Sequence, residues 1–460
     1  MQFPYFPYFP HFVRPTRLIQ RMAVLALLAH VSVPLWAVEP QPLSLGEAQQ
    51  IAAARSPQIV AQEAVARAAR DMAVSAGQLP DPVLKLGIDN LPVSGADRLS
   101  VSRDFMTMRR IGIMQELPRE EKRRLKAERF GHDADRAQAQ RQLALAGLQR
   151  DTALAWLERY YSEAQQTLLQ QQTQETRLQV QAADIAFRAG RGTQADVLAA
   201  RAALVMLEDR ISQTDRQARN ASLTLARWVG ADADRPLPAG SFGPVVWQNT
   251  SPGTLLSLDH LKQHPQLTIL AAQREAAESE ARLAQANTQS DWTVEAAYQH
   301  RGPSFSNMIS LGVSVPLQWD QKNRQNREMG ARLALVEEAK ANYEDMLRAH
   351  ESEVRTMLND WQSGKARVAR YGRELLPLAA QRTEAALTAY RIGKSDLGTA
   401  LTARRDEIDT RIQAITLELE TARLWAQLNY LIPDSAADKH NALTPSLSPH
   451  DTPASAKGQP

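Results

Sequence analysis

The chain of 460 residues contains no cysteine. This absence excludes disulfides, any metal site built from thiolates, and a lipid anchor on an N-terminal cysteine. After Ala29 the sequence also lacks an apolar run long enough to cross a bilayer as a helix, which takes about 20 residues. If this protein enters a membrane, we expect it to do so as β-strands.

The chain also has little net charge, with 54 basic and 51 acidic residues. The small excess comes from residues 1–37, which hold three arginines and no acidic residue, so no basic patch points to nucleic acid. In this segment the arginines precede a short apolar run, 22–29, and a candidate cleavage site after Ala37. This pattern predicts a secretory signal peptide over 1–37. The alternatives are an uncleaved anchor or a start codon placed too early.

The sequence shows no known catalytic arrangement. It has no phosphate-binding glycine loop, dinucleotide fingerprint, zinc-protease histidine pair or nucleophile elbow. His260 and His264 have helical i, i+4 spacing but no evident third ligand, which favours a structural role. We therefore expect no enzyme activity and no cofactor.

What the sequence does contain is a long internal repeat. Five short segments recur in the same order at an offset of about 200–210 residues. They pair Ser56-Pro57 with His264-Pro265, Asp81-Pro82 with Asp291-Trp292, 111–113 with 311–313, 187–190 with 390–393, and 225–228 with 428–431. This predicts two copies of one domain-sized fold, a first repeat over 38–250 and a second over 251–433. The segment 434–460, rich in Pro, Ser, Ala and Asp, is predicted to be a disordered tail.

Each repeat holds two segments in which apolar and polar residues alternate, as in a strand with one apolar face. These predict strands at about 81–90, 108–117, 291–300 and 308–317. The apolar face would be core in a soluble sandwich and would face lipid in an outer-membrane barrel. The pattern alone leaves both open, but the leader and the small number of strands favour the membrane. Because four strands cannot close a pore in one chain, several chains would have to share a barrel.

The rest of each repeat has the pattern of long helices. No proline occurs over 120–187, which would span roughly 100 Å as one helix. Apolar residues recur there, and again over 347–389, at the three–four spacing of helices packed as coiled coils. Pro377 predicts a bend or a turn in the second run. Gly190 and Gly393 follow the two runs and predict hairpin tips, at about 188–193 in the first repeat and about 391–396 in the second.

This order of elements, two strands and a long helical hairpin with glycine at its tip, repeated once, resembles the TolC family of outer-membrane efflux channels. The residues that carry the resemblance are Ser56-Pro57, His264-Pro265, Leu79-Pro80-Asp81-Pro82, Gly112, Gly312, Phe187–Gly190 and Tyr390–Gly393. The resemblance implies a mainly α fold with a small β part. Long antiparallel coiled-coil helices would form an α-helical barrel, and four strands per protomer would contribute to a shared twelve-stranded, trimeric outer-membrane β-barrel.

The resemblance also implies location and partners. The protein would be a homotrimer in outer-membrane lipid with its helices in the periplasm, a passive duct fed by an inner-membrane RND-type pump through a periplasmic adaptor. The segment 104–118 resembles channels of heavy-metal efflux systems, so heavy-metal cations are the predicted cargo. The alternatives are a drug-efflux or type I protein-secretion duct and, from another class, a soluble periplasmic coiled-coil adaptor. Adaptors usually carry a lipoyl-like β module, and none is visible in the sequence.

In that family the tunnel closes at the hairpin tips, where acidic residues just after the glycine commonly form a ring. Asp196 matches this position in the first repeat, whereas Thr399 replaces it in the second and Asp396 lies nearby. The simpler interpretation is that both aspartates cap the returning helices. Other tip residues are also predicted to contribute to the gate or to adaptor docking: Arg188, Gly190, Arg191, Arg391, Gly393 and Lys394. The alternative is that the charges among them are ordinary solvated surface.

Three methionines, Met106, Met108 and Met114, lie at and beside the second predicted strand. Thioether sulfur suits Cu(I) and Ag(I), so a transient path for a soft metal is one interpretation. Methionine also fills apolar surface, and this is the stronger interpretation. These residues are therefore only weak candidates for metal contact.

Overall fold

The fold is taken from a computed structural model, which describes residues 41–238 and 261–431. The predicted signal peptide and tail, and His260, lie outside the described residues. The described residues from Pro42 onward belong to one unit. The two repeats are therefore described together.

Both repeat starts are helix starts, as the sequence indicates. Helix α1 (Leu45–Arg55) ends at Ser56, whose hydroxyl accepts a hydrogen bond from the backbone N–H of Ile59 and so caps α2 (Pro57–Gly77). Helix α8 (Pro265–Ala286) begins in the same way, with the ring of His264 accepting from the backbone of Gln266. In each case the proline stands at the first helical turn, where its missing N–H costs nothing.

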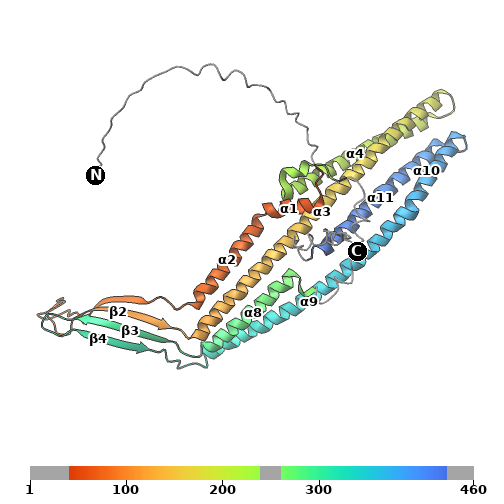
Figure 1. The fold of residues 1–460 in the computed structure, drawn as a ribbon. Helices are drawn as coiled ribbons and strands as arrows, with labels where there is room; N and C mark the ends of the chain where they lie inside the picture. Colours follow the sequence, from red (N-terminus) through yellow and green to blue (C-terminus); the bar gives the residue numbers. More distant parts are fainter. Residues whose placement is uncertain (1–40, 239–260, 432–460) are drawn as a thin grey trace, which may run out of the picture. The chain divides into compact units, whose positions relative to one another are not determined.

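The four predicted strands form a single antiparallel sheet in the order β1-β2-β3-β4 (Figure 1). The strands are β1 (Val83–Asp89), β2 (Met108–Leu117), β3 (Trp292–His300) and β4 (Met308–Ser314). Strand β2 of the first repeat pairs with β3 of the second, placing Ile111 opposite Tyr298. The repeats therefore share one sheet. Strand β4 stops before the predicted end at 317, and Pro316, which has no N–H for the ladder, follows closely.

The first helical hairpin consists of α3 (Glu120–Arg188) and α4 (Gln194–Val229), followed by a short 3₁₀ turn, η1 (Gly230–Asp234). Helix α3 has 69 residues, a length of about 100 Å at 1.5 Å per residue. The prediction of a long helix here is confirmed, and the helix is continuous over its whole length.

The second hairpin is interrupted on its first arm. Helix α9 (Gln325–Arg370) passes through a π-helical turn, η2 (Tyr371–Leu375), into α10 (Leu376–Arg391), and α11 (Leu397–Asn429) returns. Pro377 stands in the first turn of α10. Because proline cannot donate to the carbonyl four residues earlier, the wide π turn directly before it accommodates the ring, and the helix continues.

The main core draws on both repeats. Trp156 of α3 and Trp361 of α9 are at most 2% exposed and lie in one cluster with Leu225 of α4 and Trp425 of α11. The indole N–H of Trp156 donates to the carbonyl of Leu43 at 2.9 Å, which fixes the chain just before α1. Burial of large side chains from all four long helices joins the two hairpins into one body.

Candidate functional site

One face of the sheet is apolar and exposed. The register aligns apolar residues of all four strands, and each is at least 44% exposed: Leu84, Leu86, Ile88, Ile111, Ile113, Tyr298, Ile309, Leu311 and Val313. The predicted alternation is therefore confirmed, but this face packs on no core of the chain. A contiguous apolar surface of this kind indicates contact with another protein or with lipid.

The opposite face of the sheet is polar and carries ion pairs. Lys85 Nζ lies 2.6 Å from a carboxylate oxygen of Glu295, and Arg110 Nη1 lies 3.4 Å from the other oxygen. Arg110 also contacts Asp89, with 3.2 Å between Nε and Oδ2. These charged groups lie on three different strands, so the network joins the two repeats.

The sheet has two free edges within the chain. Strands β1 and β4 are outermost, and each pairs with one neighbour only. Edge strands present unpaired backbone N–H and C=O groups that can pair with another strand. Both edge strands are seven residues long, so the two edges match each other in length.

The hairpin tips have the same geometry in both repeats. Gly190 and Gly393 have φ angles of 70° and 71°, in the left-handed region that glycine adopts without strain. The N–H of Arg191 donates to the carbonyl of Ala186 at 2.9 Å, and Lys394 makes the equivalent bond to Ala389 at the same distance. This bonding is that of a Schellman cap, so the glycine stop signals are confirmed.

The residues after the glycines are caps, with their roles exchanged between the repeats. In the first tip, Thr193 is the N-cap of α4, and Asp196 closes a capping box with it. In the second tip, Asp396 is the N-cap of α11, and its carboxylate accepts from the N–H and the hydroxyl of Thr399 at 2.8 and 2.9 Å. The bond from the Thr399 N–H, followed by that from its hydroxyl, lowers the pKa of Asp396. Capping, the simpler prediction, is confirmed for both aspartates.

The cationic tip residues are mostly free of ion pairs. Arg188 pairs with Asp184 of the same helix at 2.6 Å. Arg191, Arg391 and Lys394 are exposed and have no ion pair among the described residues. The structure thus places the predicted cations at the tips, with three of them open to solvent in the single chain.

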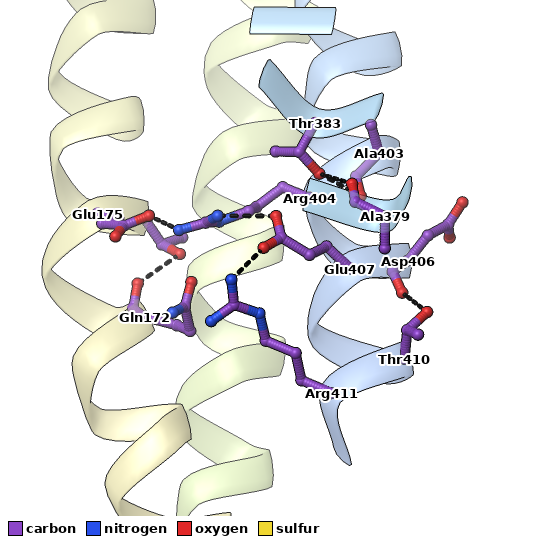
Figure 2. Close-up of polar contacts among 11 residues, drawn as sticks. Gln172, Glu175, Ala379, Thr383, Ala403, Arg404, Asp406, Glu407, Thr410 and Arg411 are labelled. Atoms are coloured by element: carbon purple, nitrogen blue, oxygen red, sulfur yellow. Dashed lines mark hydrogen bonds and ion pairs between the residues drawn. The ribbon is translucent and has the colours of Figure 1, made fainter. Parts of the chain in front are cut away.

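A polar network centred on the buried Glu407 joins the hairpins (Figure 2). Arg404 of α11 forms an ion pair with Glu175 of α3 and a second one with Glu407, at 2.9 Å. Glu407 is 3% exposed and also accepts from Arg411 at 2.6 Å. Burial opposes its charged form, but polar contacts with Thr383, Arg404 and Arg411 outweigh this and lower the pKa of Glu407.

Sequence reasoning did not find this network. Arg404 and Arg411 stand three residues before and four residues after Glu407, a spacing that places all three on one helix face. Such a charged triplet ordinarily indicates a solvated surface. Only Glu407 of the triplet is buried, and Glu175, far away in the sequence, reaches Arg404 because α3 packs on α11.

The methionine candidates do not converge. Met108 and Met114 lie on the same face of β2, six residues apart, which separates them by about 20 Å at the rise of a strand. Met106 is 47% exposed in the loop before β2. Across 41–238 and 261–431, no three His, Cys, Asp or Glu side chains are grouped so that they could hold a metal ion. No helix in these stretches is both long and apolar enough to cross a bilayer.

The architecture matches that of bacterial outer-membrane channels. The outer-membrane channel OprN superposes with a TM-score of 0.69 at 18% identity, covering 84% of this chain and 89% of that one. The outer membrane protein VceC of Vibrio cholerae gives 0.70 at 20% identity, covering 84% and 95%. CusC, whose structures concern folding and transmembrane channel formation, gives 0.71 at 14% identity, covering 92% and 99%.

At these identities the likeness concerns the fold. It confirms the predicted mainly helical class, with long helices and a four-stranded antiparallel sheet, as in TolC-like channels. No model of a known protein family matches the chain, and neither does any curated protein.

Proposed function

We propose that this protein is a non-enzymatic outer-membrane channel, one protomer of the exit duct of a tripartite efflux system. The observation that carries this proposal is the sheet, which has one exposed apolar face, one polar face and two free edges. Lipid against the apolar face and water against the polar face would satisfy both surfaces. The fold shared with OprN, VceC and CusC supports this assignment over a periplasmic adaptor.

The free edges support self-assembly. With three copies, β4 of each chain would pair with β1 of the next and give a closed ring of twelve strands without unpaired edges. Helix α4 supports the same conclusion, because Leu198, Val205 and Leu223 fall on one helix face and are 58–71% exposed in the single chain. We propose a homotrimer whose helices lie in the periplasm.

The membrane assignment can be tested by charging each face of β4 in turn. Leu311 is 81% exposed on the apolar face, and Ser310 is its neighbour on the polar face. A lysine on a lipid-facing strand costs about 2–4 kcal/mol near the middle of the bilayer, and little on the water side. We expect Leu311→Lys to abolish the heat-sensitive oligomer in outer membranes and Ser310→Lys to preserve it. Recovery of the unmodified protein as a soluble periplasmic monomer would contradict the proposal.

The tips are proposed as the gate and the adaptor-docking region. Arg188, Arg191, Arg391 and Lys394 would meet the adaptor, and the pair between Arg404 and Glu175 would hold α11 against α3 in the closed state. Both aspartates are engaged as caps, so an acidic ring would have to form from carboxylates that already accept hydrogen bonds. The Arg404→Ser variant, compared with Arg405→Ser on the same helix, is expected to raise channel conductance in lipid bilayers.

For the cargo we propose heavy-metal cations, on the resemblance of the segment 104–118. Deletion of the gene is expected to raise sensitivity to copper, silver or zinc ions. If only sensitivity to antibiotics rises, the duct serves drug efflux instead.

A further inference from the structure

The ion pairs on the polar face of the sheet cross a row of small residues. Gly112 lies between Lys85 and Ala297 in the register, and Glu295 stands one row away on β3. Arg110 stands one row beyond Gly112 on the other side. A Cβ atom at Gly112 would lie 2.8 Å from that of Ala297, so no larger side chain fits there. Because Gly112 and Ala297 have little or no side chain, Lys85 and Arg110 can both extend over them to the carboxylate of Glu295.

The charges in this network cancel. Two cations, Lys85 and Arg110, face two anions, Glu295 and Asp89, and Glu295 is the anion that both cations share. The side chains of the four are 27–32% exposed, so they are paired but still in contact with water. On this face of the four strands there is one other charged residue, Glu116, near the end of β2.

We infer that Glu295 sets the electrostatic potential along this part of the duct, keeping it neutral so that cations and anions pass alike. This inference rests on the proposed function, because it requires the polar face to line the water. Loss of Glu295 leaves two cations against one anion in every copy, and loss of Lys85 leaves the reverse. Any selection for metal cations would then be made elsewhere than beside this network.

The absence of cysteine makes the potential measurable. A single reporter, Ser310→Cys on β4, would stand beside the network, about 8 Å from position 295 by strand geometry. The cysteine is modified in separate experiments by a cationic and by an anionic methanethiosulfonate reagent. The ratio of the two rates reports the local electrostatic potential, because a negative potential attracts the cationic reagent and repels the anionic one. The trimer is reconstituted in lipid nanodiscs at about 10 mM salt, where the screening length is about 30 Å.

With the network intact, the cation-to-anion rate ratio is expected to equal that of a small free thiol. Glu295→Gln is expected to lower the ratio about fourfold, the effect of one unit charge at about 8 Å in a water-filled space. Lys85→Gln is expected to raise it by a similar factor, because its ammonium lies 2.6 Å from Glu295. The double variant is expected to return the ratio to its original value. If one single variant fails to assemble, the other and the double variant still decide the sign.

A matched control removes a negative charge from the same face of the sheet, at a position farther from the reporter cysteine than Glu295. Glu116 lies about 16 Å from position 310 by strand geometry, so Glu116→Gln is expected to change the ratio less than about twofold. A ratio that favours cations strongly in the unmodified network, or one that does not respond to Glu295→Gln, would overturn the inference.

A second reporter separates this failure from a failure of the proposed function. Leu311→Cys lies on the apolar face, next to position 310. It is expected to be protected from both reagents if lipid covers it. If Cys introduced at 311 reacts as fast as that at 310, the proposed membrane face is wrong. If it is protected while the ratio at 310 does not respond, only the inference about Glu295 fails.

Discussion

Two buried histidines are expected to make the stability of the helical part depend on pH. The rings of His264, at the start of α8, and His350, on α9, lie 4.1 Å apart, and the residues are 8% and 6% exposed. Burial, and then the nearby His350, lower the pKa of His264 from 6.5 to about 4. Burial also lowers the pKa of His350, against the opposing effect of Glu353. The folded state therefore favours neutral rings.

The sign and size of the effect follow from the pKa of His264. Between pH 6.5 and 4 the unfolded chain binds a proton that the folded chain does not, so stability is full above about pH 6.5 and falls as the pH drops. A shift of about 2.5 pH units corresponds to at most about 3.4 kcal/mol, of which about 2 kcal/mol is lost by pH 5. For a chain of this length that is a decrease in Tm of about 2–3 °C.

The assay is thermal unfolding of the purified protein at about pH 7.5 and pH 5, compared between the unmodified chain and His264→Asn. Asparagine is a good N-cap and does not titrate, so the acid-induced decrease in Tm should become about 2–3 °C smaller. Ser56→Asn, the equivalent cap exchange at the start of α2, adds and removes no titratable group; it is the matched control and should leave the decrease unchanged. Equal decreases in the unmodified chain and in His264→Asn would refute the reasoning.

Two predictions concern glycines, each checked by thermal unfolding. An alanine that replaces Gly190 or Gly393 must adopt φ near 70°, which is expected to destabilise the protein by about 1–2 kcal/mol. The control is Gly330→Ala, at an open position within α9, which should stabilise the protein by up to about 1 kcal/mol. Gly364→Ala would place a Cβ 2.6 Å from the hydroxyl of Thr421, so α9 and α11 must separate at a cost of about 1–3 kcal/mol. An unchanged Tm for Gly364→Ala would show that the helices yield freely there.

Several features follow from the sequence because they depend on neighbours within a few residues. Alternation at period two located the four strands, and the three–four spacing located the long helices. The glycines at 190 and 393 marked the tips, since only glycine adopts the left-handed conformation there without strain. The resemblance built on these local patterns led to the fold class that the solved channels share.

Other features were decided only by the tertiary structure. The pairing of Lys85 with Glu295 joins residues 210 positions apart and depends on β2 standing between β1 and β3. The pairing of Arg404 with Glu175 depends on α3 packing against α11. The strand rise, in turn, separates Met108 from Met114, which the sequence shows only as near neighbours.

The tips show both kinds of information at once. The sequence alone determined that an acidic residue follows each glycine, at Asp196 and Asp396. Backbone geometry decided that Thr193 and Asp396 occupy the same cap position, so that the two repeats use the same pair of residue types in opposite order. The reason is physical: a cap is defined by where the helix begins, and that point depends on the φ and ψ angles of the whole turn.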